Sequence, residues 1–149
     1  MREQISEHLK EAIKAQDKRR IATLRLISAA IKDRDVEARG QGKERVSDDE
    51  LLQILAKMVK QRDESIAIYE EAGRLELAEQ EREEAVIIKE FLPQQMSEDE
   101  VAATCSRAVE ELDAGGLRDM GKVMAHLKAH YPGQMDFGKA SCIVKGMLL

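Results

Sequence analysis

The spacing of apolar residues predicts helices along almost the whole chain. Between residues 3 and 15, apolar positions recur at i, i+4, i+7 and i+8, which is the stripe of one buried helix face. Residues 18–39 are predicted to form a second helix, whose centre over residues 21–31 carries a single charge. Because this centre is apolar nearly all round, we expect other helices to surround it. Gly40 and Gly42 end the second helix.

Capping residues and helix breakers mark the remaining helices. Ser47 and Ser97 each stand three residues before a glutamate, which is the pattern of a capping box at a helix start. The first box opens a long third helix to about residue 72. A fourth helix over residues 74–92 then runs to Pro93, which cannot continue it. Three shorter helices follow, over residues 98–113, 119–130 and 137–149.

The clearest boundary lies at residues 93–96, between the long helices and the short ones. We therefore predict an all-α fold in two parts: a long-helix N-terminal domain over residues 1–92 and a small C-terminal helical bundle over residues 97–149. No segment has the pattern of a strand, and aromatic residues make up only 3% of the chain. Both features disfavour a β-sandwich or a β-barrel.

Composition narrows the class of protein further. No run of about 18 apolar residues could span a membrane, and the N-terminus lacks the apolar stretch of a signal peptide. The two cysteines, Cys105 and Cys142, stand apart in apolar surroundings, which predicts reduced core residues. Together these features predict a cytoplasmic protein. No sustained heptad pattern appears, so we expect a monomer.

The charge of the chain is unevenly distributed. The formal net charge is −5, but residues 1–45 carry +4, residues 46–90 carry −7 and residues 91–149 carry −2. This overall sign excludes a general nucleic-acid coat protein. A basic end on an acidic body still allows local docking to a polyanion.

The sequence contains no recognisable catalytic or metal-binding constellation. There is no Cys-x-x-Cys pattern for zinc, and no residue stands out as a candidate nucleophile. His126 and His130 lie four residues apart on one helix face, a spacing that can chelate a metal. No third ligand accompanies them, which favours two exposed histidines at a helix end. We therefore expect no catalytic residue, no metal and no cofactor.

One acidic residue lies on the predicted apolar row of the fourth helix. Glu81 is in phase with its buried positions, and an inward carboxylate needs a partner. Arg62 and Arg25 are the matching cations. We predict that Glu81 pairs with one of them and sets the register of the helices, which is a structural role and not a catalytic one.

Two groups of basic residues are candidates for phosphate contacts. The first is Lys18, Arg19 and Arg20 at the start of the second helix, although such a charge run is also typical of a solvated helix corner. Because there are few aromatic side chains on which bases could stack, any RNA bound here would be folded and read through its phosphates.

The second group lies in the C-terminal bundle. Lys122 and Lys139 fall in first helical turns, where free backbone N–H groups favour anions, and Lys145 lies further along the last helix. Gly121 and Gly138 would let a nucleic-acid backbone approach closely. The alternative reading is that these glycines allow tight packing of helices.

At these residues the sequence resembles the GatB/YqeY family, which comprises the tail domain of the B subunit of tRNA-dependent amidotransferases and its small free-standing relatives. The matching stretches, which together cover essentially the whole chain, are residues 23–27, 29–32, 60–66, 69, 72–74, 76–78, 92–93, 95, 97, 119–124, 136 and 138–140. The resemblance implies an all-helical fold, with long helices first and a small bundle last.

The resemblance also implies a function. In the amidotransferase the tail domain grips the outer corner of tRNA, while amide transfer takes place in other domains, for which this chain is too short. The expected function is therefore a non-catalytic tRNA-binding accessory module, with tRNA and a protein of the aminoacyl-tRNA pathway as partners. Two alternatives remain: a protein–protein adaptor that uses the acidic third and fourth helices, and an accessory to a carbon–nitrogen ligase with glutamine as amide donor.

Overall fold

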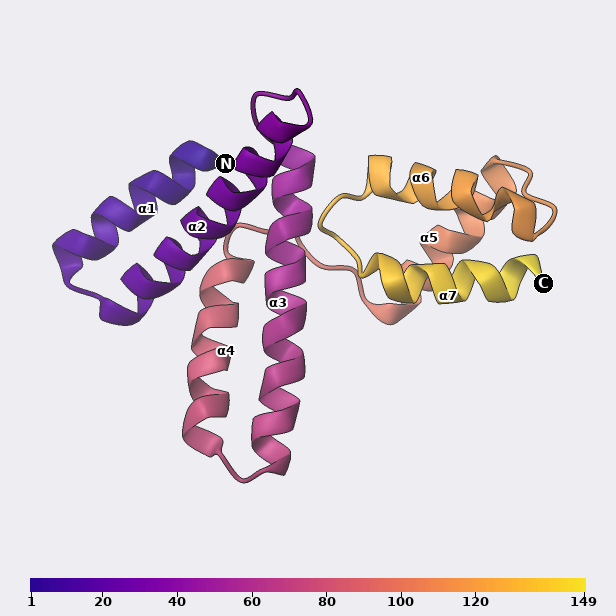
Figure 1. Ribbon diagram of the computed structural model, residues 1–149. Helices are drawn as coiled ribbons and strands as arrows, with labels where there is room; N and C mark the ends of the chain where they lie inside the picture. Colours follow the sequence, from indigo (N-terminus) through magenta and orange to yellow (C-terminus); the bar gives the residue numbers. More distant parts are fainter. The chain divides into compact units, whose positions relative to one another are not determined.

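All regular elements of the protein are helical. The computed structural model describes residues 1–149 and contains seven α-helices and one short 3-10 helix, with no strand (Figure 1). The predicted all-α fold is confirmed. The chain divides into two units, Met1–Pro93 and Gln94–Leu149, each with its own cluster of buried apolar side chains. None of the helices is both long enough and apolar enough to cross a membrane.

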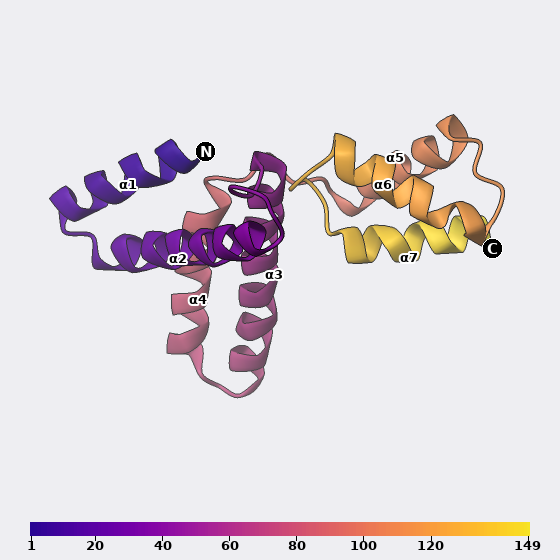
Figure 2. The ribbon, with the colours of Figure 1, turned by 45° about the horizontal axis from the view of Figure 1, so that its top comes forward.

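The first unit consists of two pairs of antiparallel helices. One pair is α1 (Arg2–Ala15) and α2 (Lys18–Gly40), and the other is α3 (Asp48–Glu71) and α4 (Leu75–Lys89). Figures 1 and 2 show α2 crossing the α3–α4 pair near the end opposite its turn. The end that carries the α3–α4 turn therefore projects beyond α2.

The core of this unit forms where α2 meets the second pair. Five side chains with no solvent exposure meet there: Leu24 and Ile27 from α2, Leu51 and Leu55 from α3, and Ile88 from α4. Burying a large aliphatic side chain contributes about 1.5–3 kcal/mol, so this cluster is the main source of cohesion between the two pairs.

The prediction that the centre of α2 is surrounded by other helices is wrong. Arg25 is exposed and Leu26 is 45% exposed, and the buried side chains lie on one face only. The exposed positions include Ser28 and Ala29, whose small side chains would gain little free energy from burial. Because only three other helices belong to this unit, α2 keeps one solvated face.

Helix ends follow the local chemistry that the sequence indicated. Ser97 forms the complete capping box: its hydroxyl accepts from the Glu100 N–H, and the Glu100 carboxylate accepts from the Ser97 N–H. Ser47 makes only the first of these bonds, accepting from the Glu50 N–H. Asp17 caps α2 in the same way, because its carboxylate accepts from the Arg20 N–H.

Two helices end earlier than predicted. Helix α4 stops at Lys89, and the following turn is closed by bonds from the residue three positions on, such as the Leu92 N–H to the Lys89 carbonyl. Pro93 disfavours the α conformation of the residue before it, which explains the early end. Helix α5 stops at Glu111, two residues before Asp113, whose φ of 49° is left-handed.

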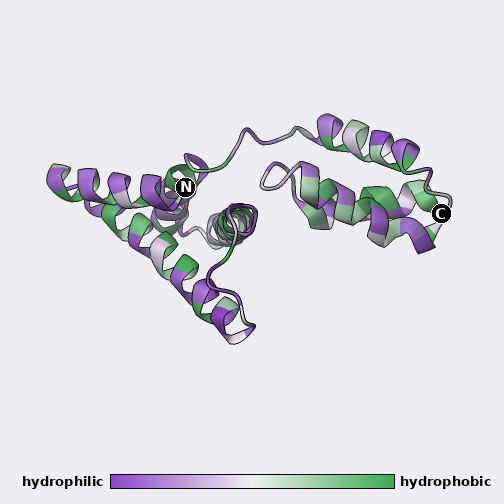
Figure 3. Cartoon of the chain, turned by 90° about the horizontal axis from the view of Figure 1, so that it is seen from above, coloured by the Kyte–Doolittle hydropathy of each residue, from purple (hydrophilic) through white to green (hydrophobic).

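The second unit is a bundle of α5 (Glu98–Glu111), α6 (Met120–His130) and α7 (Phe137–Leu148), with a 3-10 helix, Leu117–Asp119, leading into α6. Each helix carries both hydrophobic and hydrophilic residues (Figure 3). The apolar sides meet in a core whose fully buried members are Cys105, Val123, Leu127, Ala140 and Val144.

The two cysteines differ in their environments. Both are free thiols; Cys105 is buried, whereas Cys142 is exposed on α7. Burial raises the pKa of the Cys105 thiol and so keeps it protonated. The prediction that Cys142 belongs to the core is wrong, because α7 turns Ala140 and Val144 inward and leaves the position between them facing solvent.

An ion pair closes the loop between α2 and α3. The Arg2 guanidinium donates to both carboxylate oxygens of Asp35, at 2.7 and 2.8 Å, and also to the Val46 carbonyl at 3.0 Å. The Asp35 carboxylate in turn accepts from the Val46 N–H at 3.0 Å. These hydrogen bonds, led by that from Arg2, lower the pKa of Asp35 to about 2.

We expect this ion pair to make stability depend on pH. Because folding lowers the pKa of Asp35, its contribution is fully present above about pH 4, the ordinary range of an aspartate, and is lost as the pH falls towards about 2. Asp35→Asn should therefore destabilise the first unit by about 1–2 kcal/mol at pH 7. The difference from wild type in urea unfolding should shrink between pH 5 and pH 2.

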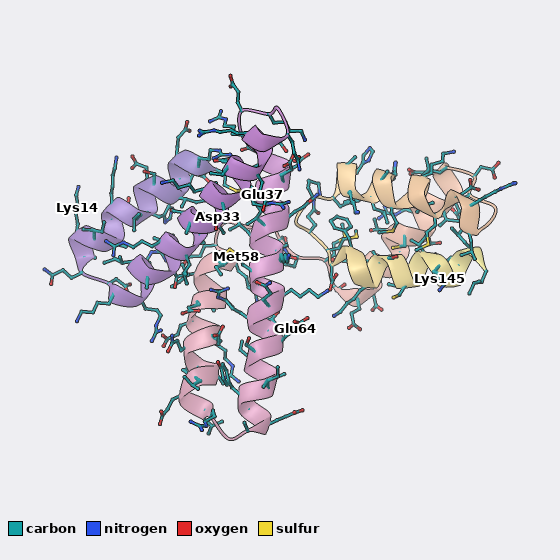
Figure 4. The ribbon with its side chains drawn as sticks, in the orientation of Figure 1. Lys14, Asp33, Glu37, Met58, Glu64 and Lys145 are labelled. Carbon is teal, nitrogen blue, oxygen red and sulfur yellow. The ribbon has the colours of Figure 1, made fainter.

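Asp33→Asn is the matched control for this prediction, because Asp33 is an exposed carboxylate on the same helix (Figure 4). It should change stability by less than about 0.5 kcal/mol at either pH. If Asp35→Asn costs the same at pH 2 as at pH 7, the ionised carboxylate is not the source of the effect.

Candidate nucleic-acid interface

The first basic group, at the start of α2, is largely occupied by ion pairs. The Arg19 Nε atom lies 3.0 Å from a Glu83 carboxylate oxygen. The Arg20 guanidinium lies 2.8 Å from the Glu90 carboxylate and 2.8 Å from Nδ1 of His8. The hydrogen bond with Glu90 raises the pKa of Arg20. Only Lys18 is exposed without such a partner, so this corner presents much less free positive charge than its sequence indicated.

The buried ion pair between α3 and α4 uses a different glutamate from the one predicted. The Nε atom of Arg62 donates to the Glu84 carboxylate at 3.2 Å, and the two side chains are only 13% and 11% exposed. Glu81 makes no ion pair and is half-buried, and Arg25 is exposed. The predicted pairing of Glu81 is therefore corrected to Glu84, while Arg62 is the cation as expected.

The physical reason for this correction lies in the helix repeat. Glu81 and Glu84 are three residues apart and share one side of α4, so the sequence pattern suits either of them. Glu84 is one turn nearer to α2, where Arg19 approaches it to 3.9 Å and the Gln80 amide donates to it. Because α2, α3 and α4 pack around this position, Glu84 and not Glu81 forms the ion pair with Arg62.

The second basic group lies in helices that contain no acidic residue. Helices α6 and α7 carry four lysines and no carboxylate within their bounds, whereas α5 carries five carboxylates and one arginine. The four lysines are Lys122, Lys128, Lys139 and Lys145, and all are exposed. The second unit therefore separates its charge by helix, and its positive charge lies on α6 and α7.

The start of α6 combines a lysine with an open glycine. Around Gly121, apart from its chain neighbours and the backbone of its own helix, no atom lies within 4 Å of the place where a Cβ would stand. This glycine is therefore not required by packing, and the backbone there is open to an approaching group. Nearby, the Lys122 ammonium donates to the Leu112 carbonyl at 3.3 Å and so tethers α6 to the end of α5.

The start of α7 is less suited to a phosphate. The Asp136 carboxylate caps this helix and accepts from the Gly138 N–H at 2.9 Å. That N–H is occupied, and the negative charge beside it would repel an anion. Lys139 and Lys145 remain available on the exposed part of α7, where Figure 4 shows Lys145 at the surface.

The two histidines of α6 stack on each other, with ring centroids 4.1 Å apart. Nε2 of His126 lies 3.6 Å from the Glu111 carboxylate, and Nδ1 of His130 lies 2.9 Å from the His126 carbonyl oxygen. No group of three or more His, Cys, Asp or Glu side chains is arranged to hold a metal ion. The geometry therefore indicates a stacked ring pair at the end of α6, in which His126 is partly buried and His130 is exposed.

Comparison with known proteins relates the whole chain to one family. The sequence profile of the family described as "Yqey-like protein" matches residues 2–148. A relative from Lachancea thermotolerans, "Altered inheritance of mitochondria protein 41, mitochondrial", is 32% identical over 110 residues. The aligned region covers 72% of this chain and 57% of the relative, so this chain spans little more than half of that protein's length.

Proposed function

This chain belongs to the Yqey-like family, and on that premise we propose that it binds folded RNA of the tRNA class as a monomeric, non-catalytic accessory module. The binding surface is that of α6 and α7, with Lys122, Lys139 and Lys145 as phosphate contacts. Gly121 gives the phosphate backbone close access to α6.

The observation that carries this proposal is the separation of charge in the second unit. Four exposed lysines on two contacting helices without a single carboxylate present a local positive surface on a protein of net charge −5. Lysines that contact phosphates give affinity without reading bases. Because the chain as a whole carries a net charge of −5, we expect tRNA binding in the micromolar range that salt weakens strongly.

The resemblance to the amidotransferase tail domain supports tRNA as the class of RNA. On that basis the protein would assist a protein of the aminoacyl-tRNA pathway, such as a carbon–nitrogen ligase that uses glutamine as amide donor. Arg19 and Arg20 are left out of the proposed surface, because both are held in ion pairs, with Glu83 and Glu90. Gly138 is left out because its N–H is already bonded to Asp136.

Charge reversal on α7 tests the proposal. Lys139→Glu/Lys145→Glu should weaken binding of fluorescent total tRNA at least tenfold in a salt series, since two phosphate contacts become repulsive. Lys32→Glu/Lys57→Glu is the matched control, because it makes the same charge change at exposed lysines of the first unit. If both variants weaken tRNA binding equally, the affinity depends on the net charge of the protein and not on the lysines of α7.

A second variant separates backbone access from charge. Gly121→Ala adds a methyl group in open space, so the melting temperature should not fall, but the methyl group should hinder a phosphate at the start of α6. Gly40→Ala, at the end of α2, is its control, because the space around that glycine is equally open and it lies outside the proposed binding surface. Absence of tRNA binding at low salt, or equal binding of an elbow-free double-stranded RNA, would contradict the proposal.

A further inference from the structure

The end of the α3–α4 pair that carries the turn exposes three large apolar side chains, those of Ile68, Leu75 and Leu77. Ile68 on α3 is 64% exposed, and Leu77 on α4 is 39% exposed. The two helices run antiparallel, and Arg62 meets Glu84 across them. Six residues on from Arg62 lies Ile68, and seven residues back from Glu84 lies Leu77, so the two apolar residues stand at the same level near the turn.

Both residues continue the rows that build the core at the other end of the pair. Ile68 lies fourteen residues after Ile54 on α3, and Leu77 lies eleven residues before Ile88 on α4, so each pair shares nearly the same side of its helix. Ile54 is 9% exposed and Ile88 has no solvent exposure, and both belong to the core cluster that includes α2 residues. The core face of the pair therefore extends past α2 to a segment that the first unit leaves uncovered (Figures 1 and 2).

Acidic residues surround this uncovered segment. Residues 61–84 contain nine Asp or Glu and three Arg. Glu64 lies one turn before Ile68 on α3 and Glu81 lies one turn after Leu77 on α4, so each carboxylate shares a side with its apolar neighbour. Neither carboxylate makes an ion pair, and Glu64 projects from α3 on the side away from α4 (Figure 4). We call Glu64, Ile68, Leu77 and Glu81 the hairpin-tip surface.

Helix α2 is an example of the kind of element that packs on this face of the α3–α4 pair. At the other end of the α3–α4 pair the covering element is α2, which packs with its apolar residues Leu24 and Ile27. Its first turn supplies two arginines, which pair with Glu83 of α4 and with Glu90 directly after α4. The same face, with unpaired carboxylates and exposed apolar side chains, continues to the hairpin tip.

From this geometry we propose that the hairpin-tip surface docks a basic amphipathic helix of a partner protein. The apolar residues of that helix would pack on Ile68 and Leu77, and its Lys or Arg residues would pair with Glu64 and Glu81. An amphipathic helix that lays its apolar face on a groove between helices is a recurring mode of recognition. The negative charge of the hairpin-tip surface repels RNA and attracts a positively charged partner helix.

The test uses the full chain and a defined probe. The probe is an 18-residue peptide with leucines at i, i+4, i+7 and i+11 and lysines on its opposite face, and a scrambled isomer of the same composition breaks the apolar stripe. We expect the amphipathic peptide to bind with micromolar affinity and at least tenfold tighter than the isomer. Binding should shift the methyl NMR signals of Ile68 and Leu77.

Two double variants and one matched control locate the contact. Ile68→Ser/Leu77→Ser should weaken peptide binding at least tenfold without lowering the melting temperature, because both side chains are exposed. Leu26→Ser/Val36→Ser is the matched control, since these residues of α2 are 45% and 60% exposed, and it should leave the affinity unchanged. Glu64→Gln/Glu81→Gln should reduce the dependence of the affinity on salt.

Several outcomes would overturn the proposal. They are no peptide binding, equal binding of the scrambled isomer, and equal loss in both serine variants. If sedimentation instead shows a dimer that only Ile68→Ser/Leu77→Ser dissociates, the occupant is a second copy of this chain and not a partner. None of these outcomes bears on the lysines of α6 and α7, so this inference and the RNA proposal stand or fall separately.

Discussion

Arg62→Ala is expected to destabilise the N-terminal unit by about 3 kcal/mol, because it leaves the buried carboxylate of Glu84 without its main cation. The two side chains are 13% and 11% exposed, and Arg62 also donates to the Met58 carbonyl at 3.3 Å. Arg19, 3.9 Å from the same carboxylate, offsets part of the loss. Urea unfolding, followed by amide exchange of α3 and α4, measures the change.

The control for this variant is an exposed ion pair of the same two helices. Arg82 pairs with Glu70 and Glu79, and both it and Glu70 are 44% exposed, so Arg82→Ala should cost no more than about 1 kcal/mol. Arg62→Met/Glu84→Leu should return to near wild-type stability, because it removes both charges together. If Arg62→Ala costs as little as Arg82→Ala, water solvates the Glu84 carboxylate and the pair is not a buried one.

Leu127→Ala is expected to unfold the C-terminal unit while the N-terminal unit remains folded. Leu127 has no solvent exposure, and truncating such a core leucine costs about 2–5 kcal/mol. The unit spans only residues 94–149, and a domain of this size has a small core and little stability to spare. The loss in free energy of unfolding should therefore exceed the stability of the C-terminal unit, so that the unit unfolds.

Backbone amide NMR spectra of the full chain measure this outcome. Signals of residues 94–149 should collapse to unfolded positions, and those of residues 1–93 should stay in place. Leu55→Ala is the reciprocal control, because Leu55 is equally buried in the other core and its truncation should disturb the first unit alone. Loss of both sets of signals in either variant would show that the two units fold as one.

Four helix starts follow from local signals in the sequence. Asp17, Ser47, Ser97 and Asp136 each cap the helix that follows them, because a short polar side chain satisfies a free N–H without help from distant residues. The candidate lysines of α6 and α7 could likewise be named in advance. Their surroundings could not, because the Asp136 bond to Gly138 and the Lys122 bond to Leu112 depend on how turns and helices meet.

The all-helical class, several helix starts and the Yqey-like family can be predicted from the sequence alone, because periodicity, caps and family motifs are properties of neighbouring residues. Which of several equivalent side chains contacts another helix depends on the tertiary structure. In the fold Arg62 pairs with Glu84 and not with Glu81, Arg19 and Arg20 pair with Glu83 and Glu90, and Cys142, Ile68 and Leu77 are exposed. Residues on one side of a helix share the same phase along its whole length, but whether each is buried depends on where another helix crosses.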